Sequence, residues 1–301
     1  MQKVLAIIGP TASGKTSIAA RILENRGNVV LISCDSRKVY RHMDIGTAKP
    51  PPELREHYRL VDIRDPSETY SAQDFARDAE REIKTALRSG LFPVVVGGTT
   101  LYYKALFEGF FSAPPVDLSL RRKLLERMER EGIEKLYEEL QEVDPVTAGK
   151  VYKRDWIRIT RALEVYHQTG KPISVLRKEA KIIPAFEPVY LGVLRDREEL
   201  YRRIEERVDR MIEAGLVEET KWLLEQGYSP DLPALNTIGY REIIEYLQGK
   251  IELGEAVRLI KKRTKIFSRK QLYFMRNLKP QPQWLPPDEV LKRALAFLSS
   301  T

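Results

Sequence analysis

Short runs of apolar residues alternate with amphipathic stretches in the first hundred residues. Continuous apolar runs at residues 4–8, 29–33 and 93–96 predict strands that are buried on both faces. Between them, the pattern predicts a helix over residues 15–25 and a second one after Ser71, a residue type that favours helix N-caps. Apolar strands separated by helices are typical of a parallel sheet with helices on both faces.

The pattern changes near residue 114. Residues 119–180 show charged, amphipathic helical patterns without a clear strand, and an apolar strand returns only at 189–194. We therefore predict an all-helical domain at residues 114–183, inserted into an α/β core formed by residues 1–113 and 184–301. Further helices are predicted in the second part of the core, near residues 197–213, 217–226, 239–248, 254–277 and 288–299.

The first predicted strand leads into the sequence GPTASGKT, which has the spacing of a phosphate-binding loop. Backbone N–H groups and the N-terminus of the following helix can bind a phosphate, Lys15 can reach its terminal oxygens, and Thr16 can bind Mg²⁺. We therefore expect the core to resemble that of P-loop nucleoside kinases. The candidate phosphate-binding residues are Gly9, Pro10, Thr11, Ala12, Ser13, Gly14, Lys15 and Thr16.

Polar residues also follow the other two strands of the first hundred residues. Asp35 comes directly after the second strand and is a candidate Mg²⁺ ligand through water or a general base, although Asp-Ser also suits a helix N-cap. The third strand is followed by Gly97, Gly98 and Thr99, where the backbone can approach a ligand closely. Because ligands bind at the carboxyl ends of parallel strands, we expect these residues and the phosphate loop to converge on one site.

The charge of the chain is concentrated in one segment. The formal net charge is +8, and residues 258–279 alone carry nine Lys and Arg residues without an acidic one. Phe267, Tyr273 and Phe274 are interleaved with these cations, a combination that suits phosphate-backbone binding and base stacking. An exposed basic face without a partner remains the alternative. A second cluster of cations, Arg154, Arg158 and Arg161, lies in the predicted insertion.

Several classes of protein are disfavoured by what the sequence lacks. The single cysteine, Cys34, excludes an internal disulfide, and three scattered histidines make a zinc site improbable. No apolar run approaches the length of a membrane span, and we expect a cytoplasmic protein. The absence of an N-K-x-D motif argues against a GTPase. A small-metabolite kinase, a transferase acting on RNA and a non-catalytic RNA-binding protein remain, and only the RNA transferase accounts for both the loop and the basic aromatic segment.

The motifs together resemble those of the bacterial tRNA dimethylallyltransferases, also called tRNA isopentenyltransferases or IPP transferases. The matching segments run in order along nearly the whole chain: GPTASGKT, DSRKVYRHMDIGTAKP, DIRDPSETYSAQDF, VVVGGTTLYYKAL, EVDPVTAG, RITRALEVYHQTGKPIS, RIEERVDRMIEAGLVEE, IGYREIIEYLQG and IKKRTKIFSRKQLYFMRN. The segments DIGTAKP and TGKPIS are more specific to this family than the phosphate loop.

The resemblance implies transfer of a dimethylallyl group from dimethylallyl diphosphate to N6 of the adenosine immediately 3′ of the anticodon. Lys15, the loop amides and Mg²⁺ on Thr16 would then bind the departing diphosphate, with Arg203 and Arg207 as a clamp. Asp35 matches the general base of the family, and Thr99 matches the residue that positions the amine and the phosphate.

Nothing in the sequence demands more than a monomer, and the resemblance implies that the helical insertion grips the tRNA anticodon stem-loop. Lys38 and Thr100 stand where the family often has glutamine and glycine, which affects the details of the adenine pocket. The tRNA contacts implied are Asp35, Ser36, Arg37, Lys38, Thr99, Arg121, Ile157, Arg158, Ile159, Thr160, Arg161, Leu235, Asn236, Thr237, Ile238, Gly239, Tyr240, Ser268, Arg269, Lys270, Gln271, Leu272, Tyr273, Phe274 and Met275.

Overall fold

The chain folds into two compact units in a computed structural model that describes residues 1–111, 114–179 and 181–300. One unit contains Met1–Glu108 and the chain from Pro184 onward, and the other is Gly109–Ile183. The helical unit therefore begins five residues before the predicted boundary at 114, because residues 110–111 pair with a strand at its other end.

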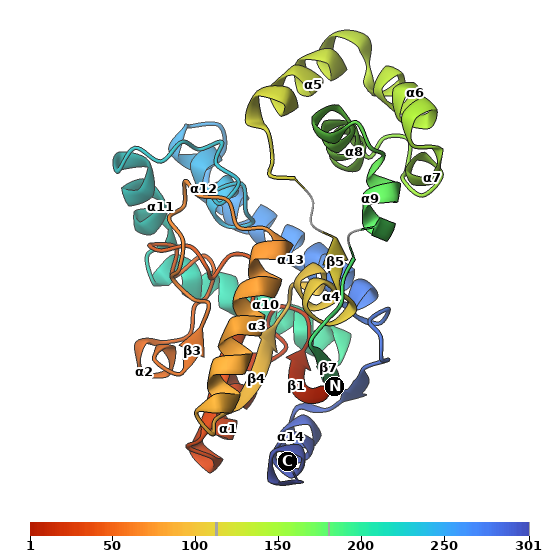
Figure 1. Cartoon of the computed structure of the whole chain (residues 1–301). Helices are drawn as coiled ribbons and strands as arrows, with labels where there is room; N and C mark the ends of the chain where they lie inside the picture. Colours follow the sequence, from red (N-terminus) through yellow and green to blue (C-terminus); the bar gives the residue numbers. More distant parts are fainter. Residues whose placement is uncertain (112–113, 180, 301) are drawn as a thin grey trace. The chain divides into compact units, whose positions relative to one another are not determined.

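A six-stranded sheet forms the centre of the first unit (Figure 1). Its strand order is β3-β2-β4-β1-β7-β8, and all neighbouring strands are parallel. The strands are β1 (Gln2–Ile8), β2 (Val29–Cys34), β3 (Tyr58–Arg59), β4 (Phe92–Gly97), β7 (Phe186–Val193) and β8 (Gln283–Leu285). The four central strands confirm the predicted apolar runs, whereas the short edge strands β3 and β8 were not predicted.

Alternate residues of the central strands face two separate hydrophobic clusters, as side chains in a strand point to opposite faces of the sheet. Leu5 and Ile7 of β1 pack with α1 (Lys15–Asn25) and α14 (Pro287–Ser300). Ala6 and Ile8 face the other cluster, to which α3 (Ala72–Arg88) and α4 (Thr100–Glu108) contribute. The predicted cap at Ser71 is confirmed, since its hydroxyl accepts the Asp74 N–H in a capping box.

Four helices lie between β7 and β8 in the first unit. They are α10 (Arg197–Glu213), α11 (Leu216–Glu225), α12 (Tyr240–Leu247) and α13 (Leu253–Met275). Each lies within a few residues of its predicted range, because each has a regular apolar stripe. The parallel sheet with helices on both faces is the predicted P-loop α/β core.

The segment between β2 and α3 contains only the short helix α2 (Pro52–Arg55) and β3, and polar contacts hold it in place. The Glu219 carboxylate on α11 accepts the backbone N–H groups of Asp44 and Ile45 at 2.8 Å each and of Gly46 at 3.1 Å. It also accepts the Tyr240 hydroxyl at 2.6 Å. A side chain at Gly46 would collide with the Tyr240 ring at 2.5 Å, which explains the glycine of the DIGTAKP segment.

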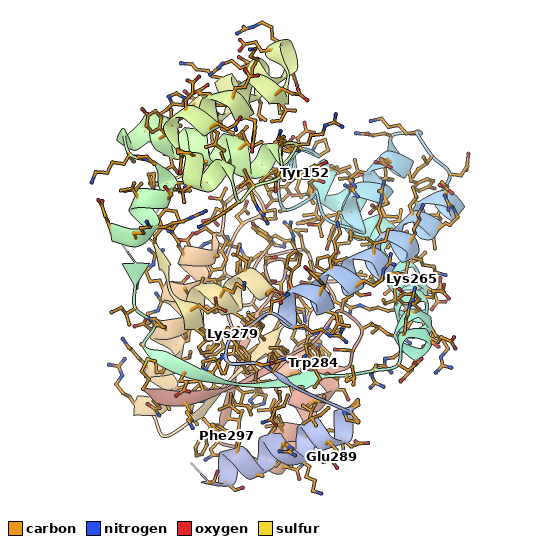
Figure 2. All side chains as sticks on the ribbon, turned by 90° about the vertical axis from the view of Figure 1, so that its right-hand side faces the viewer. Tyr152, Lys265, Lys279, Trp284, Glu289 and Phe297 are labelled. Carbon is orange, nitrogen blue, oxygen red and sulfur yellow. The ribbon has the colours of Figure 1, made fainter. Side chains whose placement is uncertain are left out.

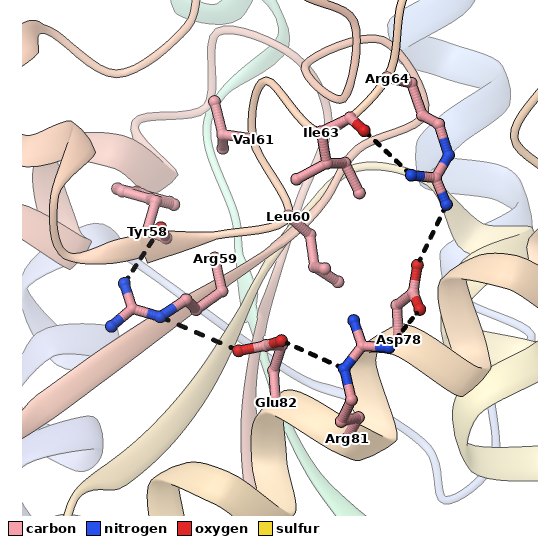
Figure 3. Close-up of a pocket in the computed structure, with 9 residues that line it drawn as sticks. All are labelled: Tyr58, Arg59, Leu60, Val61, Ile63, Arg64, Asp78, Arg81 and Glu82. Atoms are coloured by element: carbon pink, nitrogen blue, oxygen red, sulfur yellow. Dashed lines mark hydrogen bonds and ion pairs between the residues drawn. The ribbon is translucent and has the colours of Figure 1, made fainter. Parts of the chain in front are cut away.

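A cavity of about 480 Å³ lies beside β3 and α3 (Figure 3). Three arginines line it, and each is paired with a carboxylate of α3: Arg64 and Arg81 with Asp78, and Arg59 with Glu82. The pairs of Arg59 and Arg64 link the chain before α3 to that helix, whereas Arg81 pairs with Asp78 within it. The cavity is therefore lined by charges that are already paired.

The second unit is mostly helical. Buried side chains of α5 (Leu118–Glu131), α6 (Ile133–Val143) and α8 (Trp156–Thr169) form its core, joined by α7 (Pro145–Ala148) and α9 (Ile173–Glu179). The prediction of an all-helical insertion is wrong in one respect, because β5 (Phe110–Phe111) and β6 (Lys181–Ile182) form an antiparallel pair at its ends. Across the described residues of both units, no helix is long and apolar enough to cross a membrane.

Candidate active site

The phosphate loop connects β1 to α1 and has the backbone conformation that its sequence predicts. Gly14 has a φ of 101° and Ala12 a φ of 61°, so the chain turns through two left-handed positions before α1 begins at Lys15. A side chain at Gly9 would lie 2.7 Å from the Ser13 hydroxyl. That hydroxyl is buried and has no hydrogen-bond partner among the described residues, as expected for a donor that awaits a ligand oxygen.

The Lys15 side chain folds back onto the phosphate loop. Its Nζ donates to the carbonyl oxygens of Gly9 at 2.8 Å and Pro10 at 2.7 Å. Burial, together with the charges of Lys38 and Arg207, lowers the pKa of Lys15 to about 7. A bound diphosphate would reverse this effect by stabilising the charged ammonium.

Three arginines surround the same loop. Arg195 donates to the Ser13 carbonyl at 2.6 Å, Arg203 to the Ala12 carbonyl at 3.0 Å, and Arg207 to the Thr11 hydroxyl at 3.2 Å. Burial lowers the pKa of both Arg203 and Arg207. Arg195 also forms an ion pair with Glu199 of α10. Arg203 and Arg207 are thus placed at the loop, and the N–H groups that these three arginines have left can bind an anion.

Arg195 was missed by the sequence analysis. It stands two residues after the end of β7, so the rule that identified Asp35 and Thr99 at strand ends would also have identified it. Its guanidinium lies close to Gly14, where an added side chain would lie 3.1 Å from Nη2.

Gln271 on α13 joins two of the strand-end loops. Its Oε1 accepts the Thr11 N–H at 2.8 Å, and its Nε2 donates to the Gly98 carbonyl at 2.9 Å. The side chain is buried and both of its polar ends are occupied within the protein. The implied role of Gln271 as a tRNA contact is therefore not available to its side chain in this form, and the Thr11 N–H is not directed at a phosphate.

Asp35 and Thr99 lie on adjacent turns at the ends of β2 and β4. The Cys34 carbonyl accepts the N–H groups of Gly98 and Thr99 at 3.2 Å each, and the Thr99 hydroxyl accepts the Ser36 N–H at 3.1 Å. Asp35 Oδ1 accepts the Arg37 N–H at 2.9 Å. The helix N-cap alternative for Asp35 is wrong, because no helix begins there.

Asp35 faces the cations of the phosphate loop. Its charge opposes the loss of the proton from Lys15, Lys38 and Arg207, although burial is the main influence on the pKa of each and lowers it. The predicted convergence of the strand ends on one site is confirmed, because Thr99 binds the turn that carries Asp35, and Gln271 joins the Gly98 turn to the phosphate loop.

The oxygen donors of this site fit Mg²⁺. The Thr16 hydroxyl at the start of α1 and the Asp35 carboxylate are hard ligands of the kind that Mg²⁺ prefers. Within the described chain, no three His, Cys, Asp or Glu side chains are grouped to bind a metal by themselves. This arrangement suits an ion that is held by one or two protein groups, water and a substrate phosphate.

The basic segment covers α13 from Arg258 to its end and continues to Lys279, and four of its nine cations are neutralised by ion pairs. Lys261 pairs with Asp209 at 2.6 Å, and Lys265, labelled in Figure 2, pairs with Glu205; both acids are on α10. Arg263 pairs with the buried Glu242 of α12, and Arg258 pairs with Glu255 within α13. These four cations are therefore not free to bind a polyanion, although the one-sign run in the sequence suggests that they are.

The remaining cations of the segment are exposed: Lys262, Arg269, Lys270, Arg276 and Lys279. None of them has an ion pair with another described residue. Phe267, Tyr273 and Phe274 expose 45%, 67% and 48% of their surfaces, which is unusual for large apolar side chains. Free cations and exposed rings on one helix form a surface suited to single-stranded RNA.

Some of the implied tRNA contacts are buried in the protein. Other parts of the first unit cover the side chains of Ser268 and Met275 on α13 almost fully. They also cover Leu235, which precedes α12, and Tyr240, the first residue of α12. They form the supporting core of the proposed surface. Asn236 is the exposed residue between them.

In the helical unit, two of the implied tRNA contacts are held by a buried carboxylate. Glu164 accepts the Arg121 guanidinium at 2.7 Å and that of Arg161 at 2.8 Å. Ile159 and Thr160 are buried, whereas Arg158 and Ile157 are exposed. Arg121 and Arg161 therefore stabilise the unit, and the exposed pair are the residues that can meet a partner.

Comparison with known proteins agrees with this geometry. The IPP transferase family model matches residues 38–278. A Thermotoga maritima protein named tRNA dimethylallyltransferase is 47% identical over 280 residues, covering 92% of this chain and 90% of the relative. A Geotalea uraniireducens protein named tRNA dimethylallyltransferase 2 is 46% identical over 273 residues, covering 90% of this chain and 88% of the relative.

Solved structures show the same relationship. The tRNA isopentenylpyrophosphate transferase of Bacillus halodurans is 33% identical with a TM-score of 0.71, covering 100% of this chain and 96% of that one. A eukaryotic dimethylallyltransferase described as acting on tRNA is 27% identical with a TM-score of 0.81, covering 100% of this chain and 80% of that one. The chain therefore belongs to the IPP transferase family.

Proposed function

We propose that this protein transfers a dimethylallyl group from dimethylallyl diphosphate to N6 of the adenosine immediately 3′ of the anticodon in tRNA. The observation that carries the proposal is the ring of Lys15, Arg195, Arg203 and Arg207 around the phosphate loop, next to the Asp35 carboxylate. The relatives named tRNA dimethylallyltransferase match over about nine tenths of the chain and support the same reaction.

The diphosphate is the leaving group of this reaction. As the bond between the allylic carbon and its oxygen breaks, negative charge grows on the diphosphate and must be stabilised. Lys15, the three arginines and the buried Ser13 hydroxyl would supply fixed donors for that charge. Mg²⁺ bound by Thr16 and the diphosphate would add positive charge when present.

The adenine amine is the nucleophile, and its lone pair is delocalised into the ring. As N6 forms a bond to the allylic carbon it must lose a proton, and we propose that Asp35 accepts it. Oδ1 of Asp35 already accepts the Arg37 N–H at 2.9 Å, which orients the carboxylate. The Thr99 hydroxyl, held on the adjacent turn, would position the amine.

The adenine has to leave the stack of the anticodon loop to reach this carboxylate, as in other enzymes that modify bases. The exposed side of α13, with Arg269, Lys270 and the rings of Tyr273 and Phe274, would bind the RNA backbone and stack on neighbouring bases. The helical unit would add contacts to the anticodon stem through Ile157 and Arg158. All groups of this proposal come from one chain, and we propose that the protein acts as a monomer.

A transfer assay tests the proposal. The protein is incubated with radiolabelled dimethylallyl diphosphate, Mg²⁺ and unmodified tRNA, and label is expected in the RNA. A parallel reaction with ATP and candidate small acceptors tests the kinase alternative, for which we expect no phosphoryl transfer. Label that stays out of the RNA would overturn the proposal, and ATP turnover would favour the kinase.

A further inference from the structure

The side chain of Gln271 connects the two halves of the active site. One end binds the phosphate loop at the Thr11 N–H (2.8 Å), and the other binds the turn between β4 and α4 at the Gly98 carbonyl (2.9 Å). That turn carries Thr99, whose hydroxyl binds the Ser36 N–H next to Asp35. Gln271 thus joins the diphosphate side of the site to the acceptor side.

The Gln271 side chain is tightly packed between the two loops. Gln271 is only 8% exposed, and a side chain added at Gly98 would lie 2.5 Å from its Nε2. Residues on either side of Gln271 in α13 are exposed, namely Arg269, Lys270 and Tyr273. One side of α13 therefore forms the proposed RNA surface, and its other side is hydrogen-bonded to both the phosphate loop and the Gly98 turn.

Ion pairs extend the same connection to α10. Lys261 and Lys265 of α13 pair with Asp209 and Glu205 of α10. That helix carries Arg203 and Arg207, which also bind the phosphate loop. Helix α13 therefore contacts the phosphate loop directly through Gln271 and indirectly through α10.

We propose that Gln271 is a positioning residue that couples RNA binding on α13 to diphosphate binding in the phosphate loop. RNA bound on α13 fixes the helix, Gln271 then fixes the Thr11 and Gly98 backbones, and the loop binds diphosphate more tightly. By thermodynamic linkage, diphosphate strengthens RNA binding by the same factor. This inference rests on the proposed function, since it takes tRNA and a diphosphate as the two ligands.

The test is a binding cycle. The Kd of inorganic diphosphate with Mg²⁺ is measured by calorimetry, with and without a saturating RNA stem-loop that carries the anticodon sequence. In the wild type, RNA is expected to lower this Kd by about 5-fold or more, within the usual range of coupling between sites. In Gln271→Met, which keeps the length of the side chain and removes both hydrogen bonds, the ratio of the two Kd values is expected to fall to about 1.

Two further variants make the result specific. Gly98→Ala leaves Gln271 in place and displaces its Nε2, so it is expected to abolish the coupling as well. Lys270→Gln lies on the exposed side of the same helix and is expected to weaken RNA binding while the ratio at saturating RNA stays at the wild-type value. A general loss of folding would change the diphosphate Kd measured without RNA. We therefore predict that Gln271→Met keeps the wild-type Kd without RNA and loses the decrease in Kd that RNA causes.

The outcomes separate this inference from the proposed function. A wild-type protein that prenylates tRNA but shows a ratio of 1 refutes the coupling and leaves the function standing. A Gln271→Met protein that retains the wild-type ratio refutes the role of Gln271. A wild-type protein that binds both ligands cooperatively but transfers no prenyl group supports the coupling and overturns the function.

Discussion

Replacing Arg269 and Lys270 together with glutamine is expected to reduce the salt dependence of RNA binding. Each cation that contacts a phosphate of single-stranded RNA contributes about 0.7 to the slope of log K against log salt concentration. Removing both should therefore make the slope shallower by about 1.4. Both side chains are exposed on α13 and have no ion pair among the described residues.

The structure sets the size of the total effect. Residues 258–279 carry nine cations, which would give a slope of about −6.3 if all met phosphates. Four of them are held in ion pairs: Arg258, Lys261, Arg263 and Lys265. The five that remain would contribute about −3.5 from the whole segment 258–279.

The assay is fluorescence anisotropy of a labelled anticodon stem-loop at several salt concentrations. The matched control replaces Lys265 with glutamine and its partner Glu205 with glutamine, which removes a paired cation without changing the net charge. We expect this control to keep the wild-type slope. If it lowers the slope as much as the Arg269 and Lys270 replacements do, the ion pairs do not withhold charge from RNA and the reasoning is wrong.

Three further predictions follow from the active site and its support. Asp35→Asn is expected to lower kcat roughly 10²–10⁴-fold with little change in the Kd of either substrate, and normal turnover in single-turnover kinetics would exclude the base assignment. Because the pKa of Lys15 is about 7 in the free protein and a bound diphosphate stabilises the ammonium, binding takes up a proton above that pH. The affinity for diphosphate should then fall by up to about tenfold per pH unit above pH 7.5. Lys15→Arg stays charged over this range and should remove this pH dependence. An identical pH profile in both proteins would contradict the role of the Lys15 proton. Glu219→Ala removes the acceptor for three backbone N–H groups and the Tyr240 hydroxyl, so it should lower the free energy of unfolding in urea by about 3 kcal/mol. The control Glu225→Ala, at an exposed position of the same helix, should cost less than about 1 kcal/mol. Equal losses would show that the Glu219 contacts do not stabilise the fold.

Local sequence patterns predict the central elements of this fold well. The helix at Lys15–Asn25 and the strands on either side of it lie where the apolar runs and the glycine loop place them. The edge strands β3 and β8 contain two and three residues, which is too short for any periodicity to register. The pairing of Phe110–Phe111 with Lys181–Ile182 joins positions some seventy residues apart, and no local pattern predicts it.

Contacts between distant residues also explain what the sequence reveals of the site and what it leaves out. The strand-end rule placed Asp35, Thr99 and the phosphate loop together, because each belongs to one strand and its following turn. The acids that neutralise Lys261 and Lys265 lie 52 and 60 positions earlier, so the basic run appears free in the sequence. Gln271 lies 260 positions from Thr11, and only the fold brings them within hydrogen-bond distance.

The central claim is that the phosphate loop binds a prenyl diphosphate whose organic group passes to an adenosine of tRNA. The most direct measurement is mass spectrometry of nuclease fragments of a tRNA that has reacted with dimethylallyl diphosphate, Mg²⁺ and the protein. We predict one added dimethylallyl group, on the adenosine immediately 3′ of the anticodon, and none when Asp35→Asn replaces the wild type in a brief reaction. An unmodified tRNA, or a prenyl group on another nucleoside, would contradict the account.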